Sequence, residues 1–161
     1  MSKINRDLPE IRIKDAWLLR ENVSQHLHEL WAGDADKLAG DDDMQEIIVA
    51  YIKEWKRYEE EILSMMTGLL NLEFRKNIID VYIAPWFYAF SDPLVMGVTF
   101  TPQQFVDQLT HEMIHILLTD NDKASIDSLG SPVGDVWARL FGDQHSFVTL
   151  VHIPVHAIHK R

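Results

Sequence analysis

Apolar positions in the first part of the chain follow a helical spacing. From about Glu10 to Trp31 they recur three and four residues apart, as they do along one face of an amphipathic helix. These positions are Ala16, Leu19, Val23, Leu27 and Leu30. The pattern predicts a first helix over this range. The Gly- and Asp-rich stretch AGDADKLAGDDD follows, and its composition indicates a loop.

A longer helix is predicted from about Met44 to Phe74. Its apolar residues alternate at spacings of three and four, as the a and d positions of a heptad repeat do. They are Ile48, Tyr51, Trp55, Tyr58, Ile62, Met65, Leu69 and Leu72. One interpretation is a helix that packs against the first helix and the core. The other is a helical seam that joins two copies of the chain as a homodimer, and the pattern is compatible with both.

The period then changes from helical to extended. NIIDVYIAPWFYAF is rich in β-branched and aromatic residues, and it predicts a strand from about Ile78 to Ala84 that stops at Pro85. The SDP tripeptide indicates a turn. LVMGVTF predicts a second short strand after that turn.

The next helix carries the clearest start signals in the chain. In TPQQFVDQLTHEMIHILL, Thr101 is a favourable N-cap and Pro102 suits the first helical position. Gln104 completes a capping box with Thr101. Asn121 is a candidate C-cap. We therefore expect a well-defined helix that begins near residue 102.

Two further helices are expected towards the C-terminal end. One begins at Ser131-Pro132 and runs through Leu140. The last spans roughly Gln144 to Lys160, with Pro154 as the position of a bend.

Composition limits the function classes that need attention. A length of 161 residues fits one domain, and 47% hydrophobic residues suffice for a packed core. A formal net charge of −10 argues against a nucleic-acid partner and against docking on an anionic membrane. No secretory signal pattern opens the chain and no apolar run could cross a bilayer, so we expect a cytoplasmic protein. Without cysteine, any metal site must use histidine and carboxylate ligands.

The segment His-Glu-Met-Ile-His at residues 111–115 carries the most specific chemistry in the sequence. On a helix, His111 and His115 lie one turn apart on the same face, a spacing that suits two ligands of a tetrahedral zinc ion. Glu112 projects beside that pair. Zinc lowers the pKa of a bound water to about 7, and a neighbouring glutamate can take its proton as general base. The alternative is a half-exposed helix with incidental histidines.

With this motif the chain resembles the zincin superfamily of metallopeptidases over roughly residues 78–118. The resemblance implies that His111 and His115 are zinc ligands and that Glu112 is the general base. It also implies that a strand before the motif helix, in VYIAPWFYAF or LVMGVTF, lines the substrate cleft and binds an extended peptide by strand addition.

A catalytic zinc needs a third protein ligand, and two familiar zincin patterns do not supply it here. No glutamate follows Glu112, so a downstream glutamate ligand is missing. The extended metzincin motif also fails, because Asn121 stands where its third histidine would be.

Histidines on the last predicted helix offer the third ligand instead. His145, His152 and His156 are spaced by seven and four, so they share one helix face. We favour His152 as the third metal ligand because it lies in the helix interior, and His145 is the alternative. His156, one turn on, could orient the substrate, stabilise an oxyanion or support a ligand from outside the metal shell. His159, beside Lys160, is expected to be solvated.

Together these patterns predict a single, mostly helical α+β domain over residues 1–161. Residues 1–75 form an N-terminal helical pair, and residues 76–161 hold a small strand region, the active-site helix and the C-terminal histidine helix. The expected function is zinc-dependent hydrolysis of a peptide or protein substrate. Two alternatives remain: a non-catalytic metal-binding domain, closed by a fourth ligand such as His145 or His156, and a metal-free helical dimerisation or interaction module.

Overall fold

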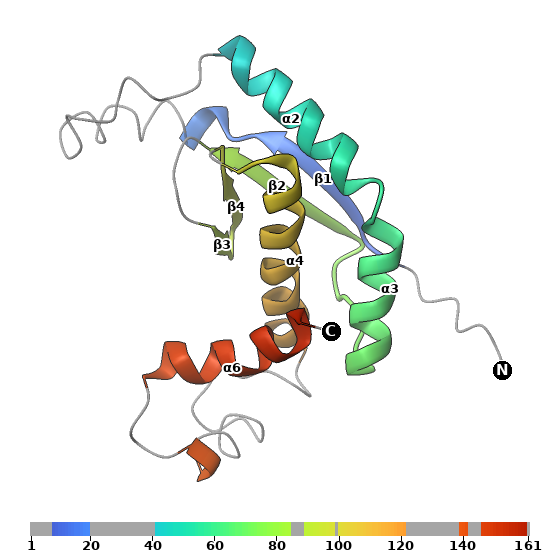
Figure 1. Cartoon of the computed structure of the whole chain (residues 1–161), viewed down its shortest axis with the longest axis vertical. Helices are drawn as coiled ribbons and strands as arrows, with labels where there is room; N and C mark the ends of the chain where they lie inside the picture. The colour runs from blue at the N-terminus through green and yellow to red at the C-terminus, as the bar shows by residue number, and fades with distance from the viewer. Residues whose placement is uncertain are drawn as a thin grey trace, which may run out of the picture. The chain divides into compact units, whose positions relative to one another are not determined.

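The computed structural model describes residues 8–19, 41–84, 89–98, 100–121, 139–141 and 146–160 of the chain. The fold is α+β, with a small four-stranded sheet and several helices (Figure 1). The chain divides into two compact units. The sheet unit comprises Glu10–Glu59 and Ile78–Leu109, and the histidine unit comprises Met1–Pro9, Glu60–Asn77 and Thr110–Arg161.

No helix among the described residues combines the length and the apolar character needed to cross a membrane.

The sheet has the strand order β1-β2-β4-β3. Strand β1 (Glu10–Asp15) pairs in parallel with β2 (Ile78–Ala84), which pairs in parallel with β4 (Leu94–Gly97). The short β3 (Phe90–Ser91) runs antiparallel to β4. Both strand predictions after residue 76 are confirmed, β2 with its bounds unchanged.

Burial along the strands explains the centre of this sheet. Ile79, Val81 and Ile83 alternate along β2 and are buried, and all four residues of β4 are buried. Such strands are typical of the middle of a sheet. In this sheet β2 lies between β1 and β4, and β4 lies between β2 and β3, whereas the short edge strand β3 includes Phe90 from the end of the segment VYIAPWFYAF.

The predicted first helix is wrong over its first six residues, which form β1. In EIRIKD, Ile11 and Ile13 alternate with charged residues at the period of two that a strand requires. Ile11 is buried, and β1 lies in register with β2 from Glu10 opposite Ile78 to Asp15 opposite Ile83. Of the remaining predicted range only residues 17–19 are described, and they are helical.

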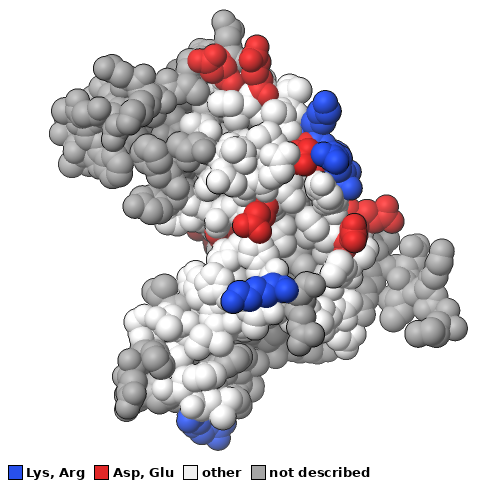
Figure 2. All heavy atoms as spheres, viewed as in Figure 1, with Lys and Arg blue, Asp and Glu red and all other residues white. Residues whose placement is uncertain are grey.

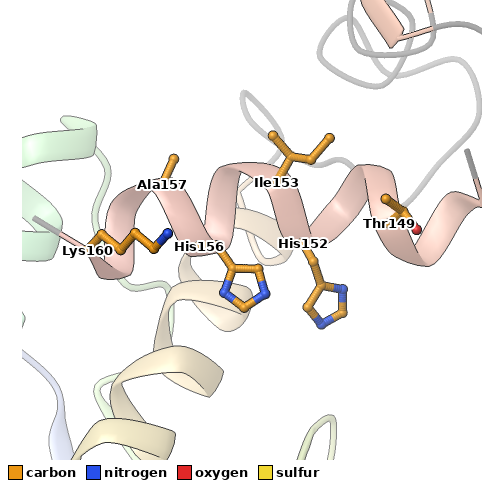
Figure 3. Close-up of a pocket in the computed structure, with 6 residues that line it drawn as sticks. All are labelled: Thr149, His152, Ile153, His156, Ala157 and Lys160. Atoms are coloured by element: carbon orange, nitrogen blue, oxygen red, sulfur yellow. The ribbon is translucent and has the colours of Figure 1, made fainter.

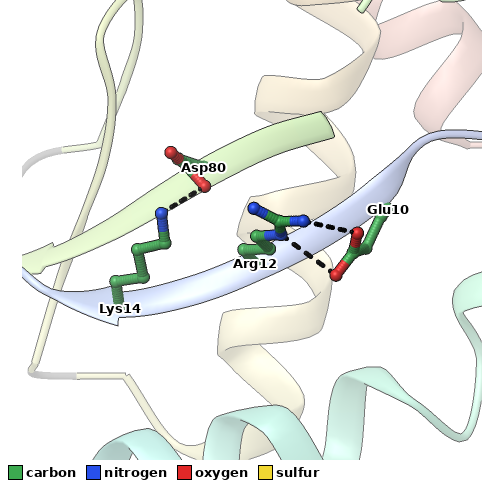
Figure 4. A network of polar contacts seen from close by, with 4 residues as sticks. All are labelled: Glu10, Arg12, Lys14 and Asp80. Carbon is green, nitrogen blue, oxygen red and sulfur yellow. Dashed lines mark hydrogen bonds and ion pairs between the residues drawn. The ribbon is translucent and has the colours of Figure 1, made fainter. Parts of the chain in front are cut away.

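Charged side chains of β1 pair on a solvent-facing side of the sheet (Figure 4). The Arg12 guanidinium donates two hydrogen bonds, at 3.0 and 2.9 Å, to the carboxylate of Glu10. Lys14 Nζ lies 2.7 Å from Asp80 Oδ1 on β2. Exposed pairs of this kind contribute little to stability. They do keep one side of an outer strand polar, which discourages pairing with other chains.

The predicted helix from Met44 to Phe74 is two helices, α2 (Asp41–Trp55) and α3 (Glu59–Leu70). The turn between them has backbone hydrogen bonds from Arg57 N to Glu54 O and from Tyr58 N to Trp55 O, three residues back instead of four. The break shifts the buried positions. Ile48, Tyr51 and Trp55 are buried as the heptad predicts, but α3 buries Leu63, Met66 and Thr67 and leaves Met65 and Leu69 53% and 56% exposed.

Helix α4 (Pro102–Thr119) starts as the sequence predicts. Gln104 N donates to Thr101 Oγ1 at 3.2 Å, and Thr101 N donates to Gln104 Oε1 at 2.9 Å, which is a reciprocal capping box. Within the sheet unit, Phe105 stacks on Tyr51 of α2 with ring centroids 4.1 Å apart. The first half of α4 is thus fixed in the core of the sheet unit, while the helix continues into the histidine unit from Thr110.

The other end of α4 and helix α6 (Phe147–His159) belong to the histidine unit. The Asn121 side-chain amide donates to Leu117 O at 2.7 Å and to Glu73 O at 3.1 Å, so Asn121 closes α4 as predicted. Ser146 caps α6 by accepting a hydrogen bond from Thr149 N, and Pro154 lies inside the helix. The helix predicted from Ser131 lies outside the described residues, except that residues 139–141 are helical.

Candidate metal centre

The histidine motif lies on a deeply buried stretch of α4. Every side chain from His111 to Leu118 is buried, so this part of α4 is enclosed on all sides. His111, Glu112 and His115 are only 9%, 6% and 8% exposed. Burial of three ionisable side chains is costly unless they are hydrogen-bonded, neutral or bound to a metal. The motif is therefore not the half-exposed helix of the alternative interpretation.

The two motif histidines point their Nε2 atoms at one another. The His111 Nε2 and His115 Nε2 atoms are 3.2 Å apart, so one can donate its hydrogen to the other when no metal is present. Two nitrogen ligands of a tetrahedral zinc ion, each at about 2.0–2.1 Å, would be about 3.3–3.4 Å apart. The helical spacing of four thus brings both nitrogens almost to the separation that a shared ion requires.

Helix α6 adds His152 to this pair. One ring nitrogen from each of His111, His115 and His152 can be chosen so that all three lie within 4.8 Å of one another. The His152 ring centroid is 4.8 Å from that of His115 and 5.5 Å from that of His111. Figure 3 shows that His152 projects from the same side of α6 as His156. The three histidines lie close enough to hold a metal ion.

Two more histidines of α6 approach His111. The ring centroids of His156 and His159 are 5.2 and 5.7 Å from the His111 ring centroid. His156 is exposed at the edge of the cluster, whereas His159 is half-buried. The expectation that His159 is merely solvated is therefore wrong. The sequence did indicate that His159 belongs to the same helix face as His152 and His156, because these three residues are spaced by four and three.

His145, the alternative third ligand, lies outside the described residues. Glu112 is placed directly after His111 on α4 and is buried. Asp120, at the end of the same helix, lies 3.6 Å from Lys76 Nζ. The structure thus brings together three predicted site residues, His111 and His115 of α4 and His152 of α6, while Glu112 is buried on α4 directly after His111.

Burial and mutual repulsion keep the two motif imidazoles neutral. Burial, followed by the positive charge of neighbouring histidines, lowers the pKa of His111 from 6.5 to about 4. The same two causes, in the same order, lower the pKa of His115 to about 4. A neutral imidazole is the form that binds a metal. At neutral pH the pair is therefore already in its ligand state.

Three imidazole nitrogens form a donor set that suits zinc, copper, iron or nickel better than magnesium or calcium, which prefer oxygen. Three protein ligands leave one position of a tetrahedral ion open, as catalytic zinc sites do.

Comparison with models of known protein families, with curated protein sequences and with solved structures finds no match for this chain.

Proposed function

We propose that this protein is a zinc-dependent hydrolase of peptide bonds. The observation that supports the proposal best is the convergence of three histidine nitrogens from two helices within 4.8 Å, with Glu112 buried on one of those helices. His111, His115 and His152 would hold the ion. Glu112 would act as the general base, in the arrangement that the zincin resemblance implies.

The donor set is consistent with zinc on two grounds. The 3.2 Å separation of the His111 and His115 Nε2 atoms is close to that of two ligands on one zinc ion. The lowered pKa of each keeps its imidazole available to a metal at neutral pH. When bound, zinc supplies a Lewis acid that polarises a carbonyl and acidifies water.

Glu112 supplies the proton transfers that hydrolysis needs. Its carboxylate takes a proton from the attacking water and then delivers it to the nitrogen of the leaving amine. Glu112 is buried on α4 directly after His111, so its backbone is held at a constant position relative to the two α4 ligands. Such positioning matters because proton transfer requires heavy atoms within about 2.6–3.2 Å.

The test compares zinc-loaded wild type with Glu112→Gln on a library of synthetic peptides, with cleavage followed by mass spectrometry. Glu112→Gln should lower the rate by about 10²- to 10⁴-fold, because it removes the general base. It should still bind one zinc, because Glu112 is not a ligand. Glu61→Gln, an exposed glutamate on α3, is the matched control and should retain full activity. Equal rates for wild type and Glu112→Gln would contradict the proposal.

A closed, non-catalytic metal site is the second candidate function. It is favoured by the His156 and His159 rings, which lie near enough to His111 for one of them to become a fourth ligand after a side-chain movement. X-ray absorption spectroscopy of the zinc protein distinguishes the two candidates. Four histidines on the ion would favour the structural role, whereas three histidines and a water-derived oxygen would favour the hydrolase. Either His156→Ala or His159→Ala should change the spectrum in the first case, and neither should change it in the second.

A further inference from the structure

Beside the histidine cluster, helix α6 borders an open hollow (Figure 3). Its described lining consists of residues three and four apart on α6: Thr149, His152, Ile153, His156, Ala157 and Lys160. The exposed lining is mainly apolar, and the lining residues with polar side chains are Thr149, His152, His156 and Lys160. The candidate ligand His152 therefore belongs both to the metal centre and to the wall of the hollow.

The charge around this hollow differs from that of the chain as a whole. The chain has 25 acidic residues and a net charge of −10, yet α6 contains no aspartate or glutamate. Lys160 follows α6 directly, and it is the only lysine or arginine among the six described lining residues. In Figure 2 the surface over described α6 shows blue atoms and no red ones. An anionic group would thus meet a cation here and no carboxylate from this helix.

We infer that this hollow binds a carboxylate of the peptide substrate, with Lys160 as its counter-charge. This inference rests on the proposed function and deepens it by naming the substrate class. The favoured substrates are peptides that carry a negative charge a short distance from the bond to be cleaved. That charge is either the C-terminal carboxylate or the side chain of aspartate or glutamate.

The length of α6 sets the distance between the charge and the scissile bond. Eight residues separate His152 from Lys160, which corresponds to about 12 Å along a helix. The Lys160 side chain runs back towards His156, which shortens the gap to the ammonium group (Figure 3). An extended peptide advances about 3.3 Å per residue. The carboxylate should therefore belong to a residue about one to three positions from the scissile bond.

The apolar part of the lining projects from α6 on the side away from the His152 and His156 rings (Figure 3). Ile153 and Ala157 are neighbours at a spacing of four and offer no hydrogen-bonding side chain. A small or apolar substrate residue would pack there without leaving a polar group unpaired. His156, exposed and one turn from both His152 and Lys160, can donate a hydrogen bond to the bound chain.

A binding experiment tests the inference apart from catalysis. Zinc-loaded Glu112→Gln protein is titrated with acetyl-Ala-Ala-Glu, its C-terminal amide and acetyl-Ala-Ala-Gln-amide, and binding is followed by NMR. The probes with a carboxylate should bind more tightly than the last one, and comparison of the first two shows which carboxylate is used. Lys160→Ala should reduce the affinity ratio between the probes with and without a carboxylate by about three- to fivefold, as expected for loss of an exposed ion pair. Lys160→Glu should reverse the preference.

The library digest completes the test in the active protein. Wild type should cleave preferentially near acidic residues or a free C-terminus, and Lys160→Glu should prefer basic residues. Cleavage with no acidic preference, or with the same preference in both proteins, would overturn the inference and leave the proposed hydrolase intact. If wild type cleaves none of the peptides faster than Glu112→Gln does, that result would instead contradict the proposed function. The substrate inference, which rests on that function, would fail with it.

Discussion

Helices α4 and α6 contribute histidines to the same cluster but hold them in different ways. From His111 to Leu118, α4 buries every side chain. Along α6 the only buried side chain among those described is Val155, while His152 is half-buried and His156 is exposed. A helix enclosed on all sides has little freedom to move, whereas one that is exposed along much of its surface can adjust.

This difference assigns the two helices separate tasks in the proposed site. The Nε2 atoms of the two α4 histidines are already 3.2 Å apart, so folding alone positions these two ligands before a metal binds. The third nitrogen, from α6, is less closely placed, within 4.8 Å. We therefore expect metal binding to draw His152 inwards and to stabilise α6 in particular, because binding energy of this kind couples to local folding.

The largest expected effect comes from the core around α4. Leu117 is fully buried, so Leu117→Ala should leave a cavity and lower the free energy of unfolding by about 2–5 kcal/mol. Ile153→Ala removes an apolar side chain from the half-buried surface of α6 and should cost less than about 1.5 kcal/mol. Urea unfolding of the metal-free proteins measures both values. Equal losses would show that α6 is as firmly packed as α4.

Per residue, a smaller effect is expected from pH, and it too depends on burial in α4. The pKa values of His111 and His115 are about 4 in the folded protein and near 6.5 when unfolded. Below pH 6.5 the unfolded state therefore binds protons that the folded state does not. The stability of the metal-free protein should fall as pH drops from about 6.5 to about 4, by at most about 3 kcal/mol per histidine.

Urea unfolding at several pH values measures this dependence. His111→Gln should flatten the slope, because the neutral amide does not titrate. His156→Gln is the matched control on α6 and should keep most of the slope, since His156 is exposed. A wild-type stability that is unchanged between pH 7 and pH 5 would show that the two buried imidazoles are free to take up protons in the folded protein.

The sequence predicted α4 almost completely because its signals are local. The capping box at Thr101 and Gln104, the closing Asn121 and the four-residue spacing of the motif all depend on neighbours along the chain. Strand β2 was also predicted with its bounds, because alternation and Pro85 frame it. These features needed no knowledge of what lies across the fold.

The errors arose where distant contacts decide the outcome. Residues 10–15 alternate as a strand does, but a strand exists only when a partner such as β2 pairs with it. The heptad pattern ran through residues 56–58 without a break, although hydrogen bonds there close a tighter turn. His159 looked like a solvated terminal residue, and its approach to His111 depends on how α6 packs against α4 within the histidine unit.

The smallest expected effects come from the caps of the two helices, and they compare α4 with α6 directly. Thr101→Ala removes the side-chain acceptor for Gln104 N and should lower the free energy of unfolding by about 1 kcal/mol. Ser146→Ala removes the equivalent acceptor for Thr149 N on α6. Because α6 is held less firmly, its first turn should fray without weakening the core, so we expect less than about 0.5 kcal/mol in urea unfolding of the metal-free protein.

Zinc titration then separates the two caps. Fraying of α6 moves His152 away from the α4 pair, so Ser146→Ala should weaken zinc binding by about two- to fivefold, in line with a cap worth roughly 0.5–1 kcal/mol. Thr101 lies nearly three turns before His111, so Thr101→Ala should leave zinc affinity unchanged. The reverse result, with zinc affinity lost only in Thr101→Ala, would mean that α4 is the adjustable helix and that α6 is the fixed one.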